Sequence, residues 1–150
     1  MFPKTHIIVN FFISLPLLFV INPVFVLIFF LSSFLIDVDH YLYYIVQENS
    51  FSLKKAYNWF VMRDSKWRKL STKERRKYAY SLLIFHGLEI ILLLSLLTTI
   101  YYPFLFIALG LFVHLAEDAI EEVPLGVIER KLFFVYSLYV YFTKTKFNHK

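Results

Sequence analysis

The chain has 150 residues, of which 59% are hydrophobic, 21% aromatic and 18% charged, and its mean hydropathy is +0.60. Soluble domains average about 45–50% apolar and about 25% charged residues, so this composition excludes an ordinary soluble domain as well as a disordered chain. The sequence contains no cysteine, which excludes a disulfide framework, a thiolate metal site and a thiol nucleophile. Any bound metal must therefore use nitrogen and oxygen ligands.

Positive charges are concentrated in the middle of the chain. The sixteen Lys and Arg residues outnumber the eleven Asp and Glu residues by five, but residues 47–79 alone hold ten bases and three acids. No Lys or Arg occurs from Thr5 to Leu53 or from Tyr78 to Glu129, and these two stretches contain nearly all of the long apolar runs. We expect the two base-free stretches to be embedded in a membrane.

Four segments are long and apolar enough to form transmembrane helices, each of which needs about 20 residues. Breaks are expected at Asn22-Pro23 and at Tyr101-Tyr102-Pro103, because proline disfavours helical geometry in the preceding residue and cannot donate a backbone hydrogen bond. The expected fold is all-α, a four-helix transmembrane bundle that forms one integral membrane domain with a basic loop and a C-terminal interfacial helix. In residue numbers, the domain is 1–150, the spans are 5–21, 24–46, 80–101 and 104–122, the loop is 47–79, and the interfacial helix is about 131–142.

The bases of the loop and of both chain ends lie on one side of such a bundle. By the positive-inside rule that side is cytoplasmic, so both termini and the loop are expected inside the cell membrane and the two proline turns outside. The apolar segment from Leu132 to Phe142 is too short to cross a bilayer and is flanked by lysines, which favours a helix lying in the interface. An alternative for residues 5–21 is a cleaved signal peptide, but Val20-Ile21-Asn22-Pro23 offers no small-residue cleavage site.

The basic loop also contains Trp59 and Trp67, and a mixture of basic and aromatic residues can mark a nucleic-acid contact. Attraction of the bases to anionic lipid head groups explains the same pattern, so we expect membrane lipid, and no nucleic acid, as the partner. Within the loop, Ser71 and Glu74 have the spacing of a capping box at the start of a helix.

Histidines and acids inside the expected spans are the most informative feature of the sequence. The spans contain no base that could neutralise the acids, and four of the five histidines lie in them, each in a different helix, while His149 lies in the tail. An ionisable side chain inside a bilayer costs about 2.5–3.5 kcal/mol on insertion scales and usually marks a functional site. The residues concerned are His6, Asp37, Asp39, His40, His86, Glu89, His114, Glu117, Asp118, Glu121 and Glu122.

Three of the expected helices carry a histidine and an acid three or four residues apart, which places both side chains on one helix face. These pairs are Asp37 with His40, His86 with Glu89, and His114 with Asp118, while the first helix offers His6 with Asn10. Helix bundles build carboxylate–histidine metal centres by converging such groups on a central site. We therefore expect a divalent metal ion as the counter-ion of the acids, with zinc first and manganese or iron as alternatives.

Each group also has an ordinary interpretation when it is taken alone. His6 can be a histidine of an N-terminal turn, and the Asp37–His40 element can be a polar break where a helix nears the interface. Glu117, Glu121 and Glu122 lie near a helix end, where most of them are expected to be solvated, with one needed on the inner face. The metal-site hypothesis depends on all four helices offering ligands at one level.

Four motifs containing these residues occur in an order that resembles a known family. They are Thr5-His6-Ile7-Ile8, Leu35-Ile36-Asp37-Val38-Asp39-His40, Phe85-His86-Gly87 and Gly110-Leu111-Phe112-Val113-His114-Leu115-Ala116-Glu117-Asp118. Over about residues 5–125 the chain resembles the YdjM-like family of membrane-bound metal-dependent hydrolases, which has an early histidine, an Asp-x-Asp-His element, a His-Arg-Gly-x-Thr-His-Ser element and a His-x-x-x-Asp element. The resemblance implies a small helical membrane protein that hydrolyses an ester, with the zinc-dependent phospholipases C as a more remote parallel.

The resemblance also implies a set of metal ligands or their immediate partners, namely His6, Asp37, Asp39, His40, His86, His114 and Asp118. The sequence differs from the family pattern in two places. Ile36 stands where proline usually precedes the first aspartate. The central element keeps only His86, with Leu88 or Glu89 where hydroxyl side chains are expected.

The leading hypothesis is a metal-dependent membrane-bound hydrolase that acts on a lipid-borne ester, a phosphodiester or a phosphomonoester, at the cytoplasmic leaflet. Asp39 or Glu89 is expected as the general base, which must reach the attacking water. Arg75, Arg76 or Lys77 is expected to bind the substrate phosphate. Two alternatives stay open. One is a cation transporter or channel with the same residues along its pathway, and the other is a non-catalytic protein whose metal clamps the helices.

Overall fold

The computed structural model describes residues 3–147, and helices make up most of this part of the chain. The tail histidine, His149, lies outside the described residues. The helices are α1 (Pro3–Leu17), α2 (Pro23–Leu35), α3 (Val38–Glu48), α4 (Leu53–Lys69), α5 (Thr72–Arg75), α6 (Leu88–Leu97), α7 (Phe104–Glu122), the 3₁₀ turn η1 (Val123–Leu125), α8 (Glu129–Leu132) and α9 (Phe134–Thr143). The strands are β1 (Tyr78–Ala79) and β2 (Thr145–Lys146).

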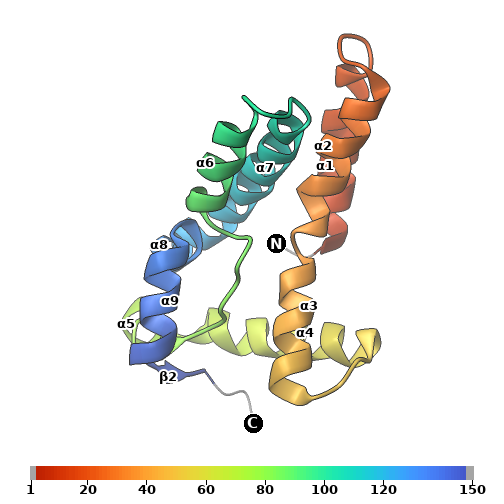
Figure 1. Ribbon diagram of the computed structural model, residues 1–150. Coiled ribbons are helices and arrows are strands. Elements are labelled where there is room, and N and C mark those ends of the chain that lie inside the picture. The colour runs from red at the N-terminus through yellow and green to blue at the C-terminus, as the bar shows by residue number, and fades with distance from the viewer. Residues whose placement is uncertain (1–2, 148–150) are drawn as a thin grey trace.

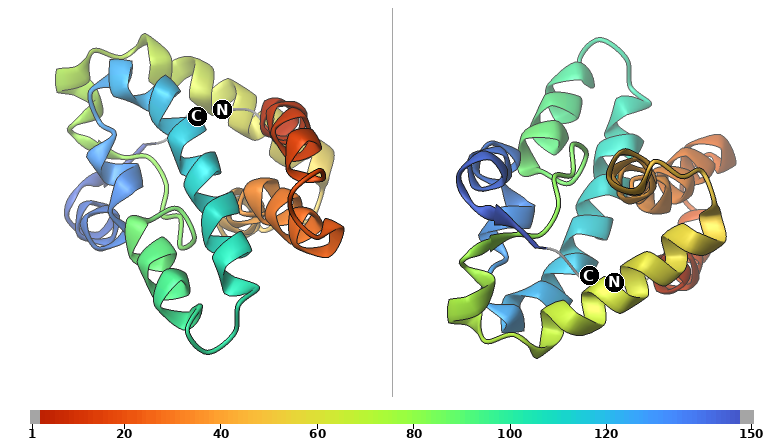
Figure 2. Two further views of the ribbon diagram at one scale, coloured as in Figure 1. Left: turned by 90° about the horizontal axis from the view of Figure 1, so that it is seen from above. Right: turned by 90° about the horizontal axis from the view of Figure 1, so that it is seen from below.

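Two helical pairs form the body of the molecule. Helix α1 packs against α2, α6 packs against α7, and α2 packs against α7. The turns that join each pair lie at the same end of the molecule, at the top of Figure 1, while α4 lies across the opposite end. Figure 2 shows α4 running past the lower ends of both pairs.

Both expected helix breaks are confirmed. Helix α1 ends at Leu17 and α2 begins at Pro23, where the missing amide of proline is harmless in the first helical turn. The side chain of Asn22 caps α2 by accepting a hydrogen bond from the amide of Val24 at 2.9 Å. Helix α7 begins at Phe104, directly after the proline of the second break.

The third expected span is a shorter helix than the sequence predicts. Residues 80–87 are not helical, and α6 begins only at Leu88. Two tertiary contacts hold this segment outside a helix. The preceding strand β1 pairs in parallel with β2, and the amide of Phe85 donates a hydrogen bond to the Asp39 carboxylate at 3.1 Å. The non-helical segment carries His86 into the interior, where it is 2% exposed.

The second expected span is interrupted by a turn. Helix α2 ends at Leu35, and α3 begins at Val38, with Ile36 and Asp37 between them. The turn lies at the acidic element that the sequence analysis singles out. It therefore places Asp37 just before α3, while Asp39 and His40 lie in its first turn.

The basic segment 47–79 is ordered rather than an open loop. It contains the 17-residue helix α4, which packs against α3 through a buried cluster that includes Tyr44 and Trp59. The capping box is confirmed, because the Ser71 hydroxyl accepts from the Glu74 amide and the Glu74 carboxylate accepts from the Ser71 amide.

Small residues allow α2 and α7 to approach closely beside the site. A Cβ atom added at Gly110 would lie 2.1 Å from the Ser32 hydroxyl oxygen and 2.6 Å from the carbonyl oxygen of Phe29. Close contact of this kind is typical of helix pairs inside membranes. One turn after Gly110, His114 comes within hydrogen-bond distance of the Ser33 carbonyl oxygen.

The all-α class is confirmed, whereas the number of membrane spans stays a prediction. By length and composition, one helical stretch of the described residues, Pro23–Glu48, is suited to cross a membrane. Helix α7 has 19 residues, but its last six include four acids. The other apolar helices, α1, α6 and α9, have at most 15 residues.

Candidate metal centre

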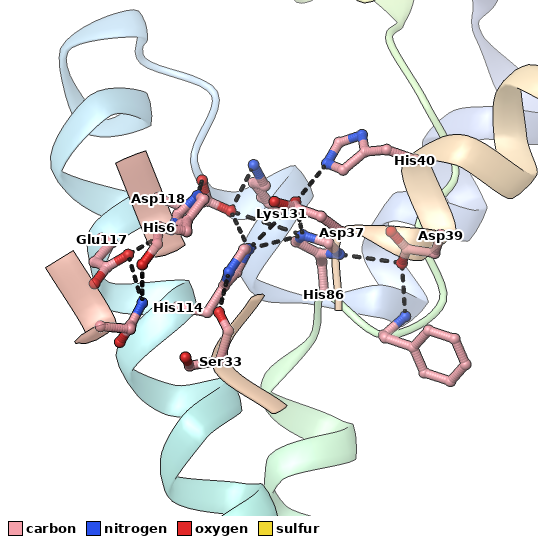
Figure 3. Close-up of polar contacts among 12 residues, drawn as sticks. His6, Ser33, Asp37, Asp39, His40, His86, His114, Glu117, Asp118 and Lys131 are labelled. Carbon is pink, nitrogen blue, oxygen red and sulfur yellow. Dashed lines mark hydrogen bonds and ion pairs between the residues drawn. The ribbon is translucent and has the colours of Figure 1, made fainter. Parts of the chain in front are cut away.

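Histidines and acids from four parts of the chain converge at one end of the helical body (Figure 3). His6 comes from the start of α1, Asp37 follows the end of α2, His86 precedes the start of α6, and His114 comes from the second half of α7. Because these helices run up and down in alternation, all four positions lie at the same end. The structure thus brings together residues separated by more than one hundred positions in the sequence.

All seven residues implied as ligands belong to this cluster. Three overlapping groups have potential ligand atoms within 4.8 Å of one another. They are His6, His114 and Asp118; Asp37, His86 and His114; and Asp39, His40 and His86. Five of the seven side chains, all except Asp37 and His40, are buried, and these two are intermediate in exposure.

Four of the ligand atoms surround a common centre. The Nε2 atoms of His86 and His114 lie 3.2 Å apart. Asp37 Oδ1 lies 3.7 Å from His86 Nε2 and 3.6 Å from His114 Nε2. Asp118 Oδ2 lies 3.8 Å and 3.2 Å from the same two atoms. Ligands of a tetrahedral zinc ion, with bonds of about 2.0–2.2 Å, are separated by about 3.3–3.6 Å, so this arrangement fits such an ion closely.

Hydrogen bonds on the far side of each imidazole indicate which nitrogen is available to a metal. His114 Nδ1 donates to the Ser33 carbonyl oxygen at 2.8 Å, and His86 Nδ1 donates to Asp39 Oδ2 at 3.1 Å. His6 Nδ1 donates to Glu117 Oε2. A carbonyl or carboxylate oxygen can only accept, so each neutral ring keeps its proton on Nδ1 and presents the lone pair of Nε2. The two lone pairs that face each other across 3.2 Å favour a shared cation.

Unsatisfied polar atoms point to the same conclusion. His6 Nε2, Asp37 Oδ2 and Asp39 Oδ1 are buried and find no hydrogen-bond partner among residues 3–147. His6 Nε2 lies 3.4 Å from Asp118 Oδ1, and the His6 ring stacks on the His114 ring with centroids 4.0 Å apart. Buried polar atoms are rarely left unpaired, and a metal ion would supply the missing partner. The donor set of imidazole nitrogens and carboxylate oxygens suits zinc, manganese or iron.

Glu117 is the inward-facing member of the acidic trio at the end of α7. It is 8% exposed, pairs with His6, and accepts a second hydrogen bond from Asn10 Nδ2 at 3.2 Å. Glu121 instead pairs with Arg68 at 2.6 Å. The sequence signal for Glu117 is its spacing of three residues from His114, which places both on one face of α7.

Lys131 is a member of the cluster that the sequence analysis missed. Its Nζ atom lies 2.7 Å from Asp118 Oδ2, although α8 is far from α7 in the expected arrangement of an interfacial helix. Burial lowers the pKa of Lys131, but the charges of Asp118 and Glu122 outweigh burial and raise this pKa above its ordinary value. The amine is therefore an ammonium ion at neutral pH.

One ammonium does not balance the acids of the cluster. Four carboxylates lie in it, those of Asp37, Asp39, Glu117 and Asp118, and among residues 3–147 Lys131 is the base that forms an ion pair with them. With neutral imidazoles, three negative charges remain on these residues. Buried charge of one sign is costly unless it is paired, so the cluster as described favours an additional cation.

The two candidates for the general base hold other side chains or backbone groups in place. Asp39 Oδ2 accepts hydrogen bonds from His86 and from the Phe85 amide. Glu89 accepts from the amides of Phe134 and Val135 at 3.0 and 3.2 Å, so it caps the start of α9. Glu89 belongs to none of the potential ligand groups among the described residues.

The three bases expected to bind substrate phosphate lie away from the cluster. Arg75 is 6% exposed and donates to the carbonyl oxygens of Trp67, Arg68 and Leu125. Arg76 donates to the carbonyl oxygen of Gly126, and Lys77 is exposed. Arg75 therefore ties α4 and α5 to the end of η1, which is a structural role.

Two cavities border the cluster. The larger has a volume of about 390 Å³, and its lining combines apolar and aromatic residues of α4 with Asp37, His40 and Lys131. The smaller has a volume of about 60 Å³, and His40, His86 and Lys131 are among its lining residues. His40 and Lys131 thus lie between the ligand cluster and both cavities.

Comparison of the chain with family models, with curated proteins and with solved structures finds no match. The resemblance to the membrane-bound hydrolases stays a prediction from the motifs, and the function is argued below from the geometry of the site.

Proposed function

We propose that this protein is a metal-dependent membrane-bound hydrolase whose substrate is a lipid-borne ester, with a phosphoester as the first candidate. The observation that carries the proposal is the pair of Nε2 atoms of His86 and His114, 3.2 Å apart and flanked by oxygens of Asp37 and Asp118. This set of ligand atoms adjoins a cavity of about 390 Å³. A structural metal site usually closes its coordination shell, whereas a catalytic site keeps a position accessible.

The residues of the cluster have distinct roles in this proposal. His6, His86, His114, Asp37 and Asp118 hold the metal ion. Asp39, Glu117 and the Ser33 carbonyl oxygen fix the orientation of the three imidazoles, as the partners of metal-bound histidines commonly do. A divalent ion in such a site activates water as a nucleophile and polarises the oxygen of the bond that is cleaved.

His40 is the residue that we assign to proton transfer. Its Nε2 atom lies 3.7 Å from Asp37 Oδ1, and its ring meets the ring of His86 with centroids 5.0 Å apart. It lines both cavities, so it can contact the ligand cluster and a bound substrate at the same time. A base must lie within hydrogen-bond reach of the proton that it accepts, directly or through one water, and His40 meets this requirement better than Glu89.

The surface of the four long helices supports a location within a lipid bilayer. Their outward side chains are large and apolar, and many are more than half exposed. Examples are Ile8 and Phe12 on α1, Val24 and Leu27 on α2, Leu92 and Leu96 on α6, and Phe112 on α7. A contiguous apolar surface of this extent is unfavourable in water, and lipid chains would cover it.

The proposed orientation places the metal centre near the cytoplasmic leaflet. The bases of α4 and α5 lie at the same end of the molecule as the cluster, and the two proline turns lie at the other end. Lipid head groups would then meet the larger cavity, whose walls include Leu53, Ala56 and Phe60. An apolar wall beside a metal centre suits an ester that remains attached to a lipid.

The test is hydrolysis by the full-length protein in lipid nanodiscs that contain a phosphomonoester or a phosphodiester lipid. We expect release of the head group or phosphate after loading with zinc or manganese, and none after chelation. His40→Ala should lower the rate by about 100-fold while the protein keeps its metal. Ser95→Ala, on the exposed face of α6, is the matched control and should leave the rate unchanged.

Two results would contradict the proposal. Metal-loaded protein that hydrolyses neither lipid would indicate a metal that only clamps the helices. Metal-driven cation flux in proteoliposomes, without hydrolysis, would indicate a transporter.

A further inference from the structure

Lys131 has a position that the proposed reaction does not yet explain. It extends from the short helix α8, its side chain is 15% exposed, and its Nζ atom lies 2.7 Å from Asp118 Oδ2. The same oxygen lies 3.2 Å from His114 Nε2. The ammonium therefore occupies one of the oxygens that the proposed metal ion requires.

A metal ion and this ammonium cannot share Asp118 Oδ2 without strong repulsion. An ion bound at about 2.0–2.2 Å from this oxygen would lie at most about 5 Å from Nζ in its present position, given the contact of 2.7 Å. Lysine has a flexible stem with four carbons and can move its charge by several ångströms. Loading of the metal is thus expected to release Lys131 from Asp118.

The released ammonium has an obvious place to go, because Lys131 lines both cavities beside the cluster. Among the described residues it is the base common to both. Arg68 lines the larger cavity but pairs with two carboxylates, and Arg130 lines the smaller cavity but donates to three backbone carbonyl oxygens. Residues 75–77 line neither cavity. Lys131 is therefore the base best placed to receive an anion.

We propose that Lys131 is the anion-binding group of the metal centre, and that it exchanges Asp118 for a phosphate oxygen when the metal binds. This inference rests on the proposed function, because it assumes the metal site and assigns the binding of the phosphate oxyanion within it. Without an anion, the ammonium competes with the metal for Asp118. With an anion, it binds the phosphate and no longer opposes the metal, so metal and phosphate bind cooperatively.

The test measures the zinc affinity of the full-length protein in phosphatidylcholine nanodiscs, by competition with a chelator, with and without inorganic phosphate. For the wild-type chain we expect phosphate to strengthen zinc binding about tenfold, a usual size for coupled sites. Lys131→Met should bind zinc about tenfold more tightly than wild type when phosphate is absent, and phosphate should then have no effect. Lys131→Arg keeps the charge and should keep the effect of phosphate. Lys144→Met removes the same charge at an exposed residue beyond α9 and should behave as wild type.

A second arm identifies the source of the phosphate. Nanodiscs doped with phosphatidic acid replace inorganic phosphate in the same titration. If only the lipid strengthens zinc binding, Lys131 binds a lipid phosphate; if both do, the phosphate group alone is sufficient, and either result supports the inference.

The failures of the two proposals can be told apart. A wild-type chain that binds no zinc would overturn the proposed function together with this inference. A wild-type chain that binds zinc with no response to either phosphate source would overturn the inference alone, and this result needs no variant to fold. An equal response in wild type and Lys131→Met would overturn it as well.

Discussion

At the scale of single residues, the second nitrogen of each histidine determines what the centre can do. Glu117, Asp39 and the Ser33 carbonyl oxygen accept the Nδ1 protons of His6, His86 and His114, which turns the three Nε2 atoms inward. A histidine without such a partner is free to adopt the other tautomer or to rotate. Partners of this kind typically change metal affinity by 10- to 100-fold when they are removed.

Glu117 offers a direct test of this orientation. Glu117→Ala removes the acceptor for His6 and Asn10, so zinc affinity should fall by about 10- to 100-fold. Glu117→Gln keeps an acceptor oxygen and should lower the affinity by less. The measurement is a chelator competition titration, with Glu129→Ala on α8 as the control. Equal zinc affinity in wild type and Glu117→Ala would contradict the role assigned to this carboxylate.

The sequence contains enough information to find the ligands but not all of their partners. Spacings of three and four residues place His40 with Asp37 and His114 with Asp118 on shared faces, and the structure brings these pairs into one cluster. Lys131 follows no such spacing. Its contact with Asp118 exists because the chain folds back through η1 and α8, and no local pattern in the sequence encodes that return.

At the scale of helices and strands, the breaks were predictable where the cause is local. Proline explains the two turns at the top of Figure 1. The non-helical segment 80–87 was not predictable, because its residues are as apolar as those of α6 and its conformation depends on the pairing of β1 with β2 and on Asp39. The turn at Ile36 and Asp37 interrupts a long apolar run for the same kind of reason, since its polar residues face partners from other helices.

Glu89 joins two of these elements, and its role as a cap can be separated from a role as a base. Glu89→Gln retains an oxygen that can accept from the Phe134 and Val135 amides, so hydrolysis and thermal stability should change little. Glu89→Ala leaves the start of α9 uncapped and should destabilise the protein by about 0.5–2 kcal/mol, the usual cost of a lost cap. Thermal unfolding in detergent and the nanodisc assay provide the two measurements. Loss of hydrolysis in Glu89→Gln with unchanged stability would instead support a role as the general base.

At the scale of the whole molecule, the separation of charge from apolar surface predicts how the protein lies in the membrane. The bases of α4 and α5 occupy one end of the helical body, and the turns between α1 and α2 and between α6 and α7 occupy the other. The positive-inside rule places the basic end in the cytoplasm. One helical stretch of the described residues has the length and composition of a span, so the arrangement of the other three requires a direct test.

The absence of native cysteine makes this test simple, because one introduced thiol can be labelled without background. We expect Thr99→Cys, in the turn after α6, to react with a membrane-impermeant maleimide in intact cells. Lys69→Cys, at the end of α4, should react only after the membrane is permeabilised. Labelling of both positions in intact cells, or the reverse order, would contradict the four-span arrangement.

The central claim is that imidazoles and carboxylates from four parts of the chain hold one divalent cation together. The most direct measurement is elemental analysis of the purified full-length protein alongside His114→Ala, with Ser95→Ala as the control. The account predicts near-stoichiometric metal in wild type and in Ser95→Ala, and loss of that metal in His114→Ala, because His114 belongs to two of the three ligand groups. A wild-type protein without metal, even after incubation with zinc, manganese and iron, would contradict it.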